Sequence, residues 1–310
     1  MRIIFFGSPA VAVPFLERLQ EAGHIIEFVV TQPDRPSGRG KIPTSPPVKE
    51  SALKRGIPVL QPAKIRQDEN VAAEINKISP DINIVVAYGQ IIPASIIYLP
   101  RFKSINVHFS LLPKYRGAAP VQWAILNGEK KTGVTIFELN EKMDEGDILT
   151  AEETDILERE NALQLETRLA QTGSFLLLET LAGIQDIRPV PQDHAQASFA
   201  PRLKKEQGRI DWTKDALSLD RMVRAFTPWP AAFTFFKGQR IIIHAGRGSA
   251  ESGPCGLPGQ VLETKKDGIA VCCGHGSVYV AERLQQENKK ALDAAEFLRG
   301  AKLNPGDFFE

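Results

Sequence analysis

Short apolar runs alternate with helix-like segments through about the first 190 residues of the chain. Apolar runs that are separated by helices are typical of buried strands joined by crossover connections. The pattern therefore predicts an α/β fold with a Rossmann-like, mostly parallel sheet and helices on both faces. The expected strands are residues 3–6, 25–31, 82–86, 104–108 and 133–139, and a helix is expected around residues 13–21.

The rest of the chain follows a different pattern. Between about residues 188 and 208, Pro, Gln, Ala and charged residues occur without periodicity, which indicates a linker. Short apolar runs between Gly- and Pro-containing turns then predict a small β-barrel. These runs are residues 232–236, 240–244, 259–262, 268–273 and 277–281, and a helix at 293–299 follows. Because 310 residues exceed the usual size of one domain, we expect a first domain at 1–189, a linker at 190–207 and a second domain at 208–310.

Polar side chains interrupt the apolar pattern at one strand end. Asn106 and His108 are two positions apart on the expected strand 104–108, so their side chains project from the same face. An amide and an imidazole on a buried strand are costly unless something uses their hydrogen-bonding groups. They indicate a substrate site, and the alternative is that both only bond to nearby loop backbone. In open sheets functional groups gather beyond the carboxyl ends of strands, where Tyr88, Gly89 and Asp144 are also expected.

Common nucleotide motifs are missing from the sequence. Gly7-Ser8-Pro9, after the first expected strand, does not follow the GxGxxG pattern, and no GxxxxGK followed by Ser or Thr occurs. A Rossmann-like layout therefore does not predict NAD binding here.

The composition is ordinary for a globular chain, with 43% hydrophobic and 24% charged residues. No apolar stretch is long enough to span a bilayer, and no signal or transit segment is evident. Three cysteines, an odd number without a CxxC pair, favour a reducing compartment, so we expect a cytoplasmic location. Cys272, Cys273 and His275 do not predict a metal site, because consecutive strand residues point to opposite faces; no metal is expected.

Positive charge is concentrated in two places. Residues 202–310 carry 17 Lys and Arg against 13 Asp and Glu, whereas residues 1–201 carry 21 against 24. Residues 34–49 contain four basic residues, one acidic residue and four prolines, so they suit neither a regular helix nor a central strand. A loop of this length inside a domain is often functional. Both regions fit a phosphate-bearing partner, and the alternative is solvated surface.

Several stretches of the chain resemble the folate-dependent formyltransferase family. They are residues 2–9, 86–89, 111–120 and 209–212, together with Asn106, His108 and Asp144, so the resemblance spans almost the whole chain. Phe109 departs from the family, whose members commonly carry a small residue at this position. The shape of the loop beside the site therefore does not follow from the resemblance.

The resemblance implies roles for individual residues. Asn106, His108 and Asp144 correspond to the catalytic trio, and Asp147 is the competing acidic residue. The implied pocket for 10-formyltetrahydrofolate consists of Ser110, Leu111, Leu112, Pro113, Val86, Tyr88 and Gly89. In members that act on tRNA an inserted loop engages the acceptor end, which assigns Arg39 and Lys41 to tRNA binding. The second domain resembles an OB-fold and is expected to bind tRNA.

Formyl transfer from a tertiary aryl nitrogen to an amine needs a neutral nucleophile, a stabilised oxyanion and a proton for the departing nitrogen. Asn106 could donate to the developing oxyanion. His108 could be a second donor or the acid for the leaving nitrogen. Asp144 would favour the protonated imidazole and could relay the proton of the amine. The sequence leaves open which proton goes where.

The implied activity is transfer of the formyl group of 10-formyltetrahydrofolate to methionine on initiator tRNA, for translation initiation. The alternative enzyme acts on an amino-sugar nucleotide and shares the trio and residues 110–113. A noncatalytic tRNA-binding protein would leave Asn106, His108 and Asp144 without a task, and a hydride-transfer enzyme fits least. The basic loop and the basic second half favour tRNA as the substrate.

Overall fold

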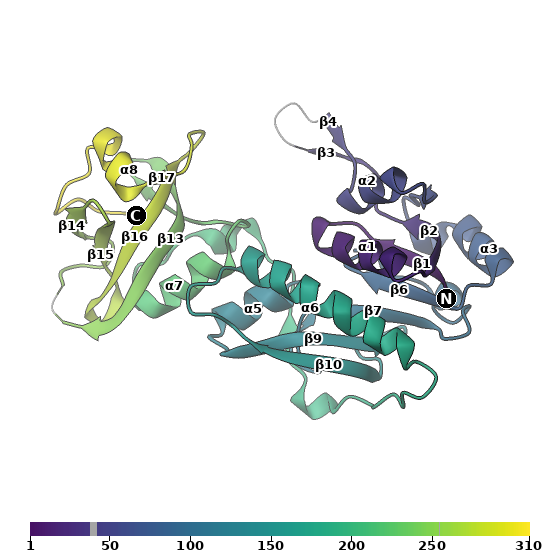
Figure 1. Ribbon diagram of the computed structural model, residues 1–310. Helices are drawn as coiled ribbons and strands as arrows, with labels where there is room; N and C mark the ends of the chain where they lie inside the picture. The colour runs from purple at the N-terminus through teal and green to yellow at the C-terminus, as the bar shows by residue number, and fades with distance from the viewer. Residues whose placement is uncertain (38–41, 254) are drawn as a thin grey trace. The chain divides into compact units, whose positions relative to one another are not determined.

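The chain forms two compact units in the computed structural model, which describes residues 1–37, 42–253 and 255–310 (Figure 1). Unit 1 consists of Met1–Pro120, Lys131–Asp155 and Glu166–Ala200. Unit 2 consists of Val121–Lys130, Ile156–Leu165 and Pro201–Glu310. The expected linker at 190–207 is therefore divided, because its residues up to Ala200 pack within unit 1.

A seven-stranded sheet forms the centre of unit 1. Its strand order is β10-β9-β7-β6-β1-β2-β5, in which β5, β2, β1, β6 and β7 are parallel and β9 is antiparallel to both of its neighbours. The strands are β1 (Arg2–Gly7), β2 (Ile25–Val30), β5 (Val59–Leu60), β6 (Ile82–Val86), β7 (Ser104–His108), β9 (Lys131–Glu138) and β10 (Ile148–Asp155). The predicted mostly parallel sheet is confirmed.

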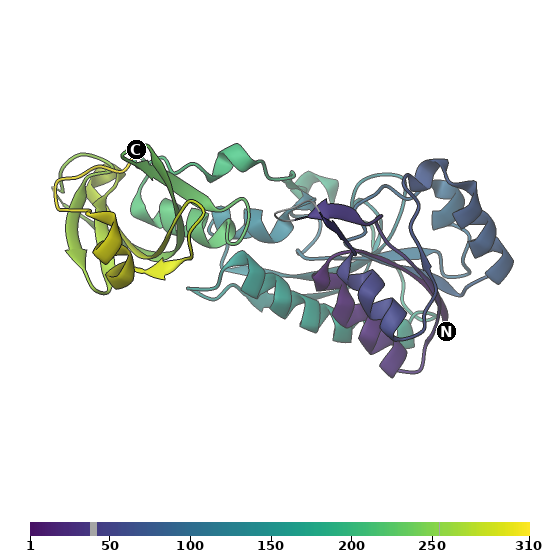
Figure 2. The same cartoon turned by 90° about the horizontal axis from the view of Figure 1, so that it is seen from above.

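Helices cover both faces of this sheet (Figures 1 and 2). α3 (Glu69–Ile78) and α4 (Ala94–Ile97) pack on the face that carries Ile4 and Phe6. The other face is covered by α1 (Val13–Glu21), α2 (Pro47–Lys54) and α6 (Ala162–Ala182). Phe15 of α1 is fully buried beside Gly173 of α6, and burial of such a side chain contributes about 2 kcal/mol. Within the described ranges, no helix is long and apolar enough to cross a membrane.

Residues 34–49 do not form one long loop. β3 (Arg35–Ser37) and β4 (Ile42–Thr44) pair as an antiparallel ribbon that is separate from the central sheet. α2 then begins at Pro47, whose fixed φ suits the first turn of a helix. Lys49 of α2 pairs with Asp34 at 2.8 Å and ties the base of the ribbon to the helix. The predicted tRNA-binding residues Arg39 and Lys41 lie outside the described residues.

The segment 190–200 runs back along unit 1. Val190 exchanges two main-chain hydrogen bonds of 2.8 Å with Ile148, at the start of β10. After the 3-10 turn η3 (His194–Gln196), β11 (Phe199–Ala200) pairs in parallel with β8 (Arg116–Gly117). The segment is therefore held at both ends, although its composition is that of a linker.

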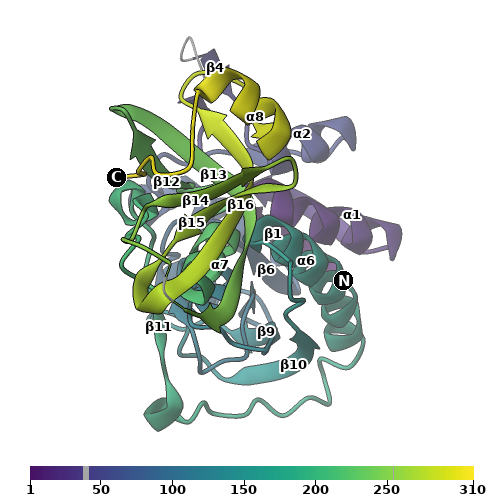
Figure 3. The same cartoon turned by 90° about the vertical axis from the view of Figure 1, so that its left-hand side faces the viewer.

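An antiparallel sheet forms most of unit 2 (Figure 3). Its order is β12-β13-β16-β15-β14, and β17 pairs with β16. The chain end joins the two outer strands, because Glu310 bonds to Phe235 of β12 and Asp307 bonds to Val261 of β14. The predicted second domain of short strands is confirmed. The strands and helices of unit 2 are β12 (Ala232–Phe236), β13 (Gln239–Ser252), β14 (Val261–Lys265), β15 (Gly268–Cys272), β16 (Ser277–Gln286), β17 (Leu292–Asp293), α7 (Ala216–Ala225) and α8 (Ala294–Ala301), together with α5 (Pro120–Leu126) from Val121 onward.

Two of the three cysteines are paired. Cys255 forms a disulfide with Cys272, while Cys273 is a buried free thiol whose pKa burial raises to about 12. The sequence did not predict this pairing. It arises because the chain at Gly259 and Gln260 runs beside Cys272 and makes two main-chain hydrogen bonds of 2.8 Å with it.

Candidate active site

A cavity of about 540 Å³ opens in unit 1 beyond the carboxyl ends of β6 and β7. Its volume is in the range of small-molecule sites. The order of the strands reverses between β1 and β6, and ligands bind at such a point in open parallel sheets. The lining residues are Val85, Ala87, Tyr88, Gly89, Gln90, Ile91, Ile92, Ile97, Asn106, Val107, His108, Phe109, Gly117, Ala118, Pro120, Leu139, Asn140, Glu141, Lys142, Met143 and Asp144.

The turn after β6 forms one wall of the cavity. Ala87 and Gly89 have left-handed backbone angles, φ 48° and 83°, so the chain turns sharply here. The carbonyl oxygen of Tyr88 accepts hydrogen bonds from Ser8 Oγ at 3.3 Å and from Gln32 Nε2 at 3.1 Å. These bonds tie the turn to the ends of β1 and β2. The Tyr88 ring is buried, and burial raises the pKa of its hydroxyl above the ordinary value.

Asn106 and His108 line the cavity from β7. The side-chain amide of Asn106 makes no hydrogen bond to another described residue, so it is available to a ligand. His108 is buried, and its Nε2 lies 2.9 Å from the carbonyl oxygen of Tyr115. Because a carbonyl oxygen only accepts, Nε2 carries a hydrogen and the other ring nitrogen, Nδ1, is left to face Asp144. Asn106 and His108, which were predicted to share one face of the strand, therefore line the same cavity.

Asp144 reaches the same cavity from the loop between β9 and β10. Its Oδ2 lies 3.8 Å from His108 Nδ1 and accepts a hydrogen bond from the Gly117 N–H at 2.7 Å. Asp144 has φ 54°, a conformation that costs a residue with a side chain about 1 kcal/mol or more. Two residues on, a Cβ at Gly146 would meet the Glu138 carbonyl oxygen at 1.7 Å. The loop is therefore tightly bent where it presents the carboxylate.

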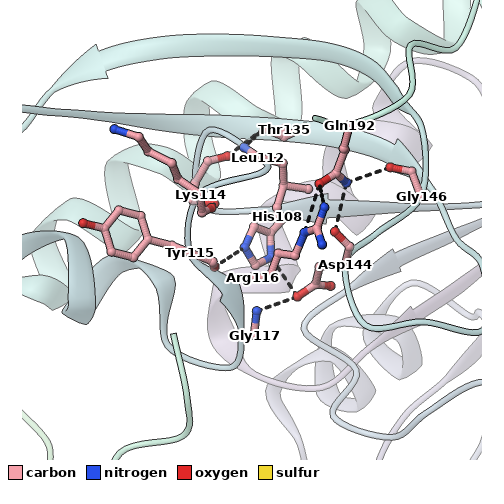
Figure 4. A network of polar contacts seen from close by, with 11 residues as sticks. His108, Leu112, Lys114, Tyr115, Arg116, Gly117, Thr135, Asp144, Gly146 and Gln192 are labelled. Atoms are coloured by element: carbon pink, nitrogen blue, oxygen red, sulfur yellow. Dashed lines mark hydrogen bonds and ion pairs between the residues drawn. The ribbon is translucent and has the colours of Figure 1, made fainter. Parts of the chain in front are cut away.

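Two further residues surround Asp144 and were not predicted (Figure 4). The buried Gln192 donates through Nε2 to the carbonyl oxygens of Asp144, at 2.9 Å, and Gly146, at 2.7 Å. Its Oε1 accepts from Nε and Nη2 of Arg116 at 3.1 and 2.6 Å. The run 111–120 marked the region of Arg116, but nothing in the linker-like composition marked Gln192.

The predicted folate-binding residues fall into two groups. Tyr88 and Gly89 line the cavity, whereas Val86 and residues 110–113 do not. Instead, the hydroxyl of the fully buried Thr135 donates to the Ser110 carbonyl oxygen at 2.7 Å and accepts from the Leu112 N–H at 3.1 Å. Residues 110–113 thus shape the turn that leads to Arg116 and Gly117. Direct folate contact by Ser110, Leu111, Leu112 and Pro113 stays a prediction.

Three other residues weighed in the sequence have defined places. Phe109, the departure from the family pattern, lies in the cavity wall, and its ring centroid is 6.3 Å from that of Phe15. Asp147 does not line the cavity, which leaves Asp144 as the carboxylate beside His108. Among the described residues, no group of three or more His, Cys, Asp and Glu side chains is arranged to hold a metal ion.

Family models match both parts of the chain. The formyl transferase model matches residues 1–181, and the model of the formyl transferase C-terminal domain matches residues 202–302. The chain belongs to the formyl transferase family, which confirms the resemblance seen in the sequence. The methionyl-tRNA formyltransferase of Citrifermentans bemidjiense is 46% identical to it over 308 residues, which cover 99% of this chain and 95% of that protein.

Solved structures show the same fold at lower identity. WlaRD, a sugar 3N-formyl transferase, is 20% identical with a TM-score of 0.66, and the match covers 94% of this chain and 99% of WlaRD. HypX from Aquifex aeolicus in complex with tetrahydrofolic acid is 20% identical with a TM-score of 0.64. That match covers 100% of this chain and 50% of HypX, so the chain spans about half of HypX. At these identities the likeness concerns the fold alone.

Proposed function

We propose that this protein transfers the formyl group of 10-formyltetrahydrofolate to the amino group of methionine esterified to initiator tRNA, in the cytoplasm, for translation initiation. One observation carries the proposal: Asn106, His108 and Asp144 line a single cavity of unit 1. They do so in a chain of the formyl transferase family whose relative at 46% identity is a methionyl-tRNA formyltransferase.

The amide of Asn106 acts on the oxygen of the formyl group. The amine nitrogen of methionine attacks the formyl carbon, and negative charge develops on the formyl oxygen before the bond from carbon to the folate nitrogen breaks. The N–H of Asn106 faces the cavity without a described partner and donates to this oxygen. Preorganised donors of this type contribute roughly two to three orders of magnitude in rate.

His108 and Asp144 act on the protons of the reaction. Because Nε2 of His108 is held by the Tyr115 carbonyl, Nδ1 is the nitrogen that exchanges a proton with the substrates. Asp144 Oδ2, at 3.8 Å, is too distant for a hydrogen bond but close enough to stabilise a positive imidazolium. The attacking amine gives its proton to this pair, and the pair returns one to the departing folate nitrogen, so both side chains end unchanged.

The cavity suits a flat, largely apolar donor. Ile91, Ile92, Ile97 and Leu139 supply the apolar wall. Asn106 and His108 contribute polar groups from β7, and Asp144 lies beside His108. Pockets of this kind bind small molecules through an apolar lining and fix their orientation through a few polar groups. The reduced pterin ring is proposed to enter between the apolar walls, with its formyl group toward β7.

Two basic regions support tRNA as the acceptor. On β12 of unit 2 the rings of Phe233 and Phe235 meet edge to face at 5.9 Å, and the guanidinium groups of Arg240 and Arg209 lie 3.9 and 5.7 Å from their centroids. Aromatic rings next to guanidinium groups suit unpaired bases and phosphates. We place this face of the OB-like domain on tRNA, and Arg39 and Lys41 at the acceptor end.

An amino-sugar nucleotide is the second candidate acceptor. WlaRD, a sugar 3N-formyl transferase, has the same fold as this chain. A small nucleotide-sugar, however, needs neither the basic segment at 34–49 nor the excess of Lys and Arg in residues 202–310. These two features favour tRNA.

The acceptor is tested by incubating the full chain with 10-formyltetrahydrofolate and either charged initiator tRNA or amino-sugar nucleotides. We expect formylated methionyl-tRNA. Arg39→Ala should raise the KM for tRNA roughly tenfold, the cost of losing one charged hydrogen bond, whereas the exposed Arg188→Ala should leave it unchanged. Formylation of the sugar alone, or an Arg39 variant that uses tRNA as well as the wild type does, would contradict the assignment.

A further inference from the structure

Both ends of the Gln192 amide are used in the structure. Its NH₂ group donates to two carbonyl oxygens of the loop that carries the catalytic carboxylate, those of Asp144 and Gly146. Its carbonyl oxygen accepts twice from Arg116. Gln192 is 5% exposed, so each of these groups would lose hydrogen-bonding capacity if the amide were removed.

Arg116 connects strand β8 to the loop that carries Asp144. Its side chain is 3% exposed and also donates to His194 Nδ1 at 3.0 Å and pairs with Glu145 Oε1 at 3.5 Å. The next residue, Gly117, donates its N–H to the carboxylate of Asp144. The main chain of the short strand β8 therefore contacts the Asp144 carboxylate directly, while the Arg116 side chain contacts the neighbouring Glu145 and the Gln192 amide that holds the Asp144 carbonyl group.

These contacts close a ring around Asp144 (Figure 4). From the Asp144 carboxylate the ring runs through the Gly117 N–H to Arg116, from the guanidinium to Gln192, and from the Gln192 amide back to the Asp144 carbonyl oxygen. The backbone of Asp144 is left-handed at φ 54°, which an aspartate adopts less readily than right-handed angles. The contacts of the ring hold it in this conformation.

We propose that Gln192 is a positioning residue: with Arg116, it fixes the backbone of the Asp144 loop and thereby the distance from the carboxylate to His108. The inference rests on the proposed function, in which Asp144 and His108 move protons. Gln192 does not line the cavity, so it acts on the reaction through the residues that it holds in place. Misplacement of a catalytic group by about 1 Å is enough to lower a rate roughly 100-fold.

The identity of the side chain follows from the contacts. The amide combines an NH₂ group with two hydrogens, one for each carbonyl oxygen, and an oxygen that accepts from Arg116. Gln192→Met keeps the size of the side chain and removes both functions. Gln192→Glu keeps the acceptor for the buried Arg116 but, when ionised, presents only oxygens to the Asp144 and Gly146 carbonyl groups. Comparing the two separates the loop contacts from the arginine contact.

The first experiment measures steady-state formylation by the full chain carrying Gln192→Met, Gln192→Glu or the control Gln196→Met. Gln196 is an exposed glutamine of the same segment, and among the described residues its side chain bonds to Asp193 alone. We expect kcat to fall roughly 10- to 100-fold in both Gln192 variants, with KM for folate and tRNA within about threefold of wild type. A loss confined to KM, or wild-type kcat in Gln192→Glu, would overturn the proposal.

A double-mutant cycle with Asp144→Asn distinguishes positioning from a general loss of structure. If Gln192 acts through Asp144, Gln192→Met should lower the residual single-turnover rate of the Asp144→Asn protein less than about threefold. An equal fold loss in both backgrounds would overturn the proposal. If Gln192→Met folds poorly, Gln192→Glu, which retains a partner for Arg116, takes its place in the cycle.

The wild-type reaction separates this inference from the proposed function. If wild type formylates an amino-sugar nucleotide and not tRNA, the tRNA assignment fails, and the same cycle is measured with the sugar acceptor. If wild type formylates tRNA and the cycle is additive, the proposed function stands and the positioning role of Gln192 fails.

Discussion

Asn106→Ala removes the amide that faces the cavity from β7 and is expected to separate catalysis from folding. The amide has no described partner and the residue is half-buried, so the free energy of unfolding should fall by less than about 1 kcal/mol. The same amide is proposed to stabilise the oxyanion, a contact whose loss costs about 3 to 4 kcal/mol of transition-state free energy. We therefore expect kcat to fall roughly 100- to 1000-fold in a protein of nearly wild-type stability.

The assay follows transfer of radiolabelled formyl groups from 10-formyltetrahydrofolate to charged initiator tRNA, with kcat and KM determined for both substrates. Asn76→Ala is the matched control, because Asn76 is an exposed asparagine of α3 that does not line the cavity. A kcat for Asn106→Ala within threefold of wild type would refute the proposed role of the amide. A loss carried entirely by the KM for folate would make Asn106 a binding residue.

Two further predictions concern buried groups. Thr135→Val should lower the free energy of unfolding by about 2 to 5 kcal/mol in urea titrations, because it strands the Ser110 carbonyl and the Leu112 N–H in the interior; a loss below 1 kcal/mol would mean that these groups find other partners. Cys273 should resist iodoacetamide at pH 8 in the native protein and react only after unfolding, since burial holds its thiol protonated with a pKa of about 12. Labelling of Cys273 in the native state, detected by mass spectrometry, would contradict that burial.

Much of the fold was predictable because buried strands are short apolar runs between turn residues. β6, β7 and β12 begin and end where these runs do. The ribbon of β3 and β4 was not predicted, because a Pro-rich stretch carries no strand pattern. An isolated two-stranded ribbon also has little need of an alternating apolar pattern. β8 and β11 have two residues each and pair across 83 positions, so no local pattern marks them.

The candidate site was predictable where polarity broke an apolar pattern. Asn106 and His108 stand out on a buried strand, and the structure places both on the cavity. Asp144 was predicted from the family resemblance, because no periodic pattern in the sequence distinguishes a functional carboxylate in a loop. Gln192 could not be found in this way, because a neutral side chain in an aperiodic stretch shows its importance only through its partners.

The path of residues 190–200 matters for anyone dividing this protein into parts. A fragment cut after residue 189 would keep all seven strands of the central sheet and the trio of Asn106, His108 and Asp144, yet lack β11 and Gln192. It would leave the Arg116 guanidinium without the oxygen of Gln192 that accepts two of its hydrogen bonds. Chimaeras that graft the first half onto a foreign RNA-binding module should therefore place the junction after Ala200.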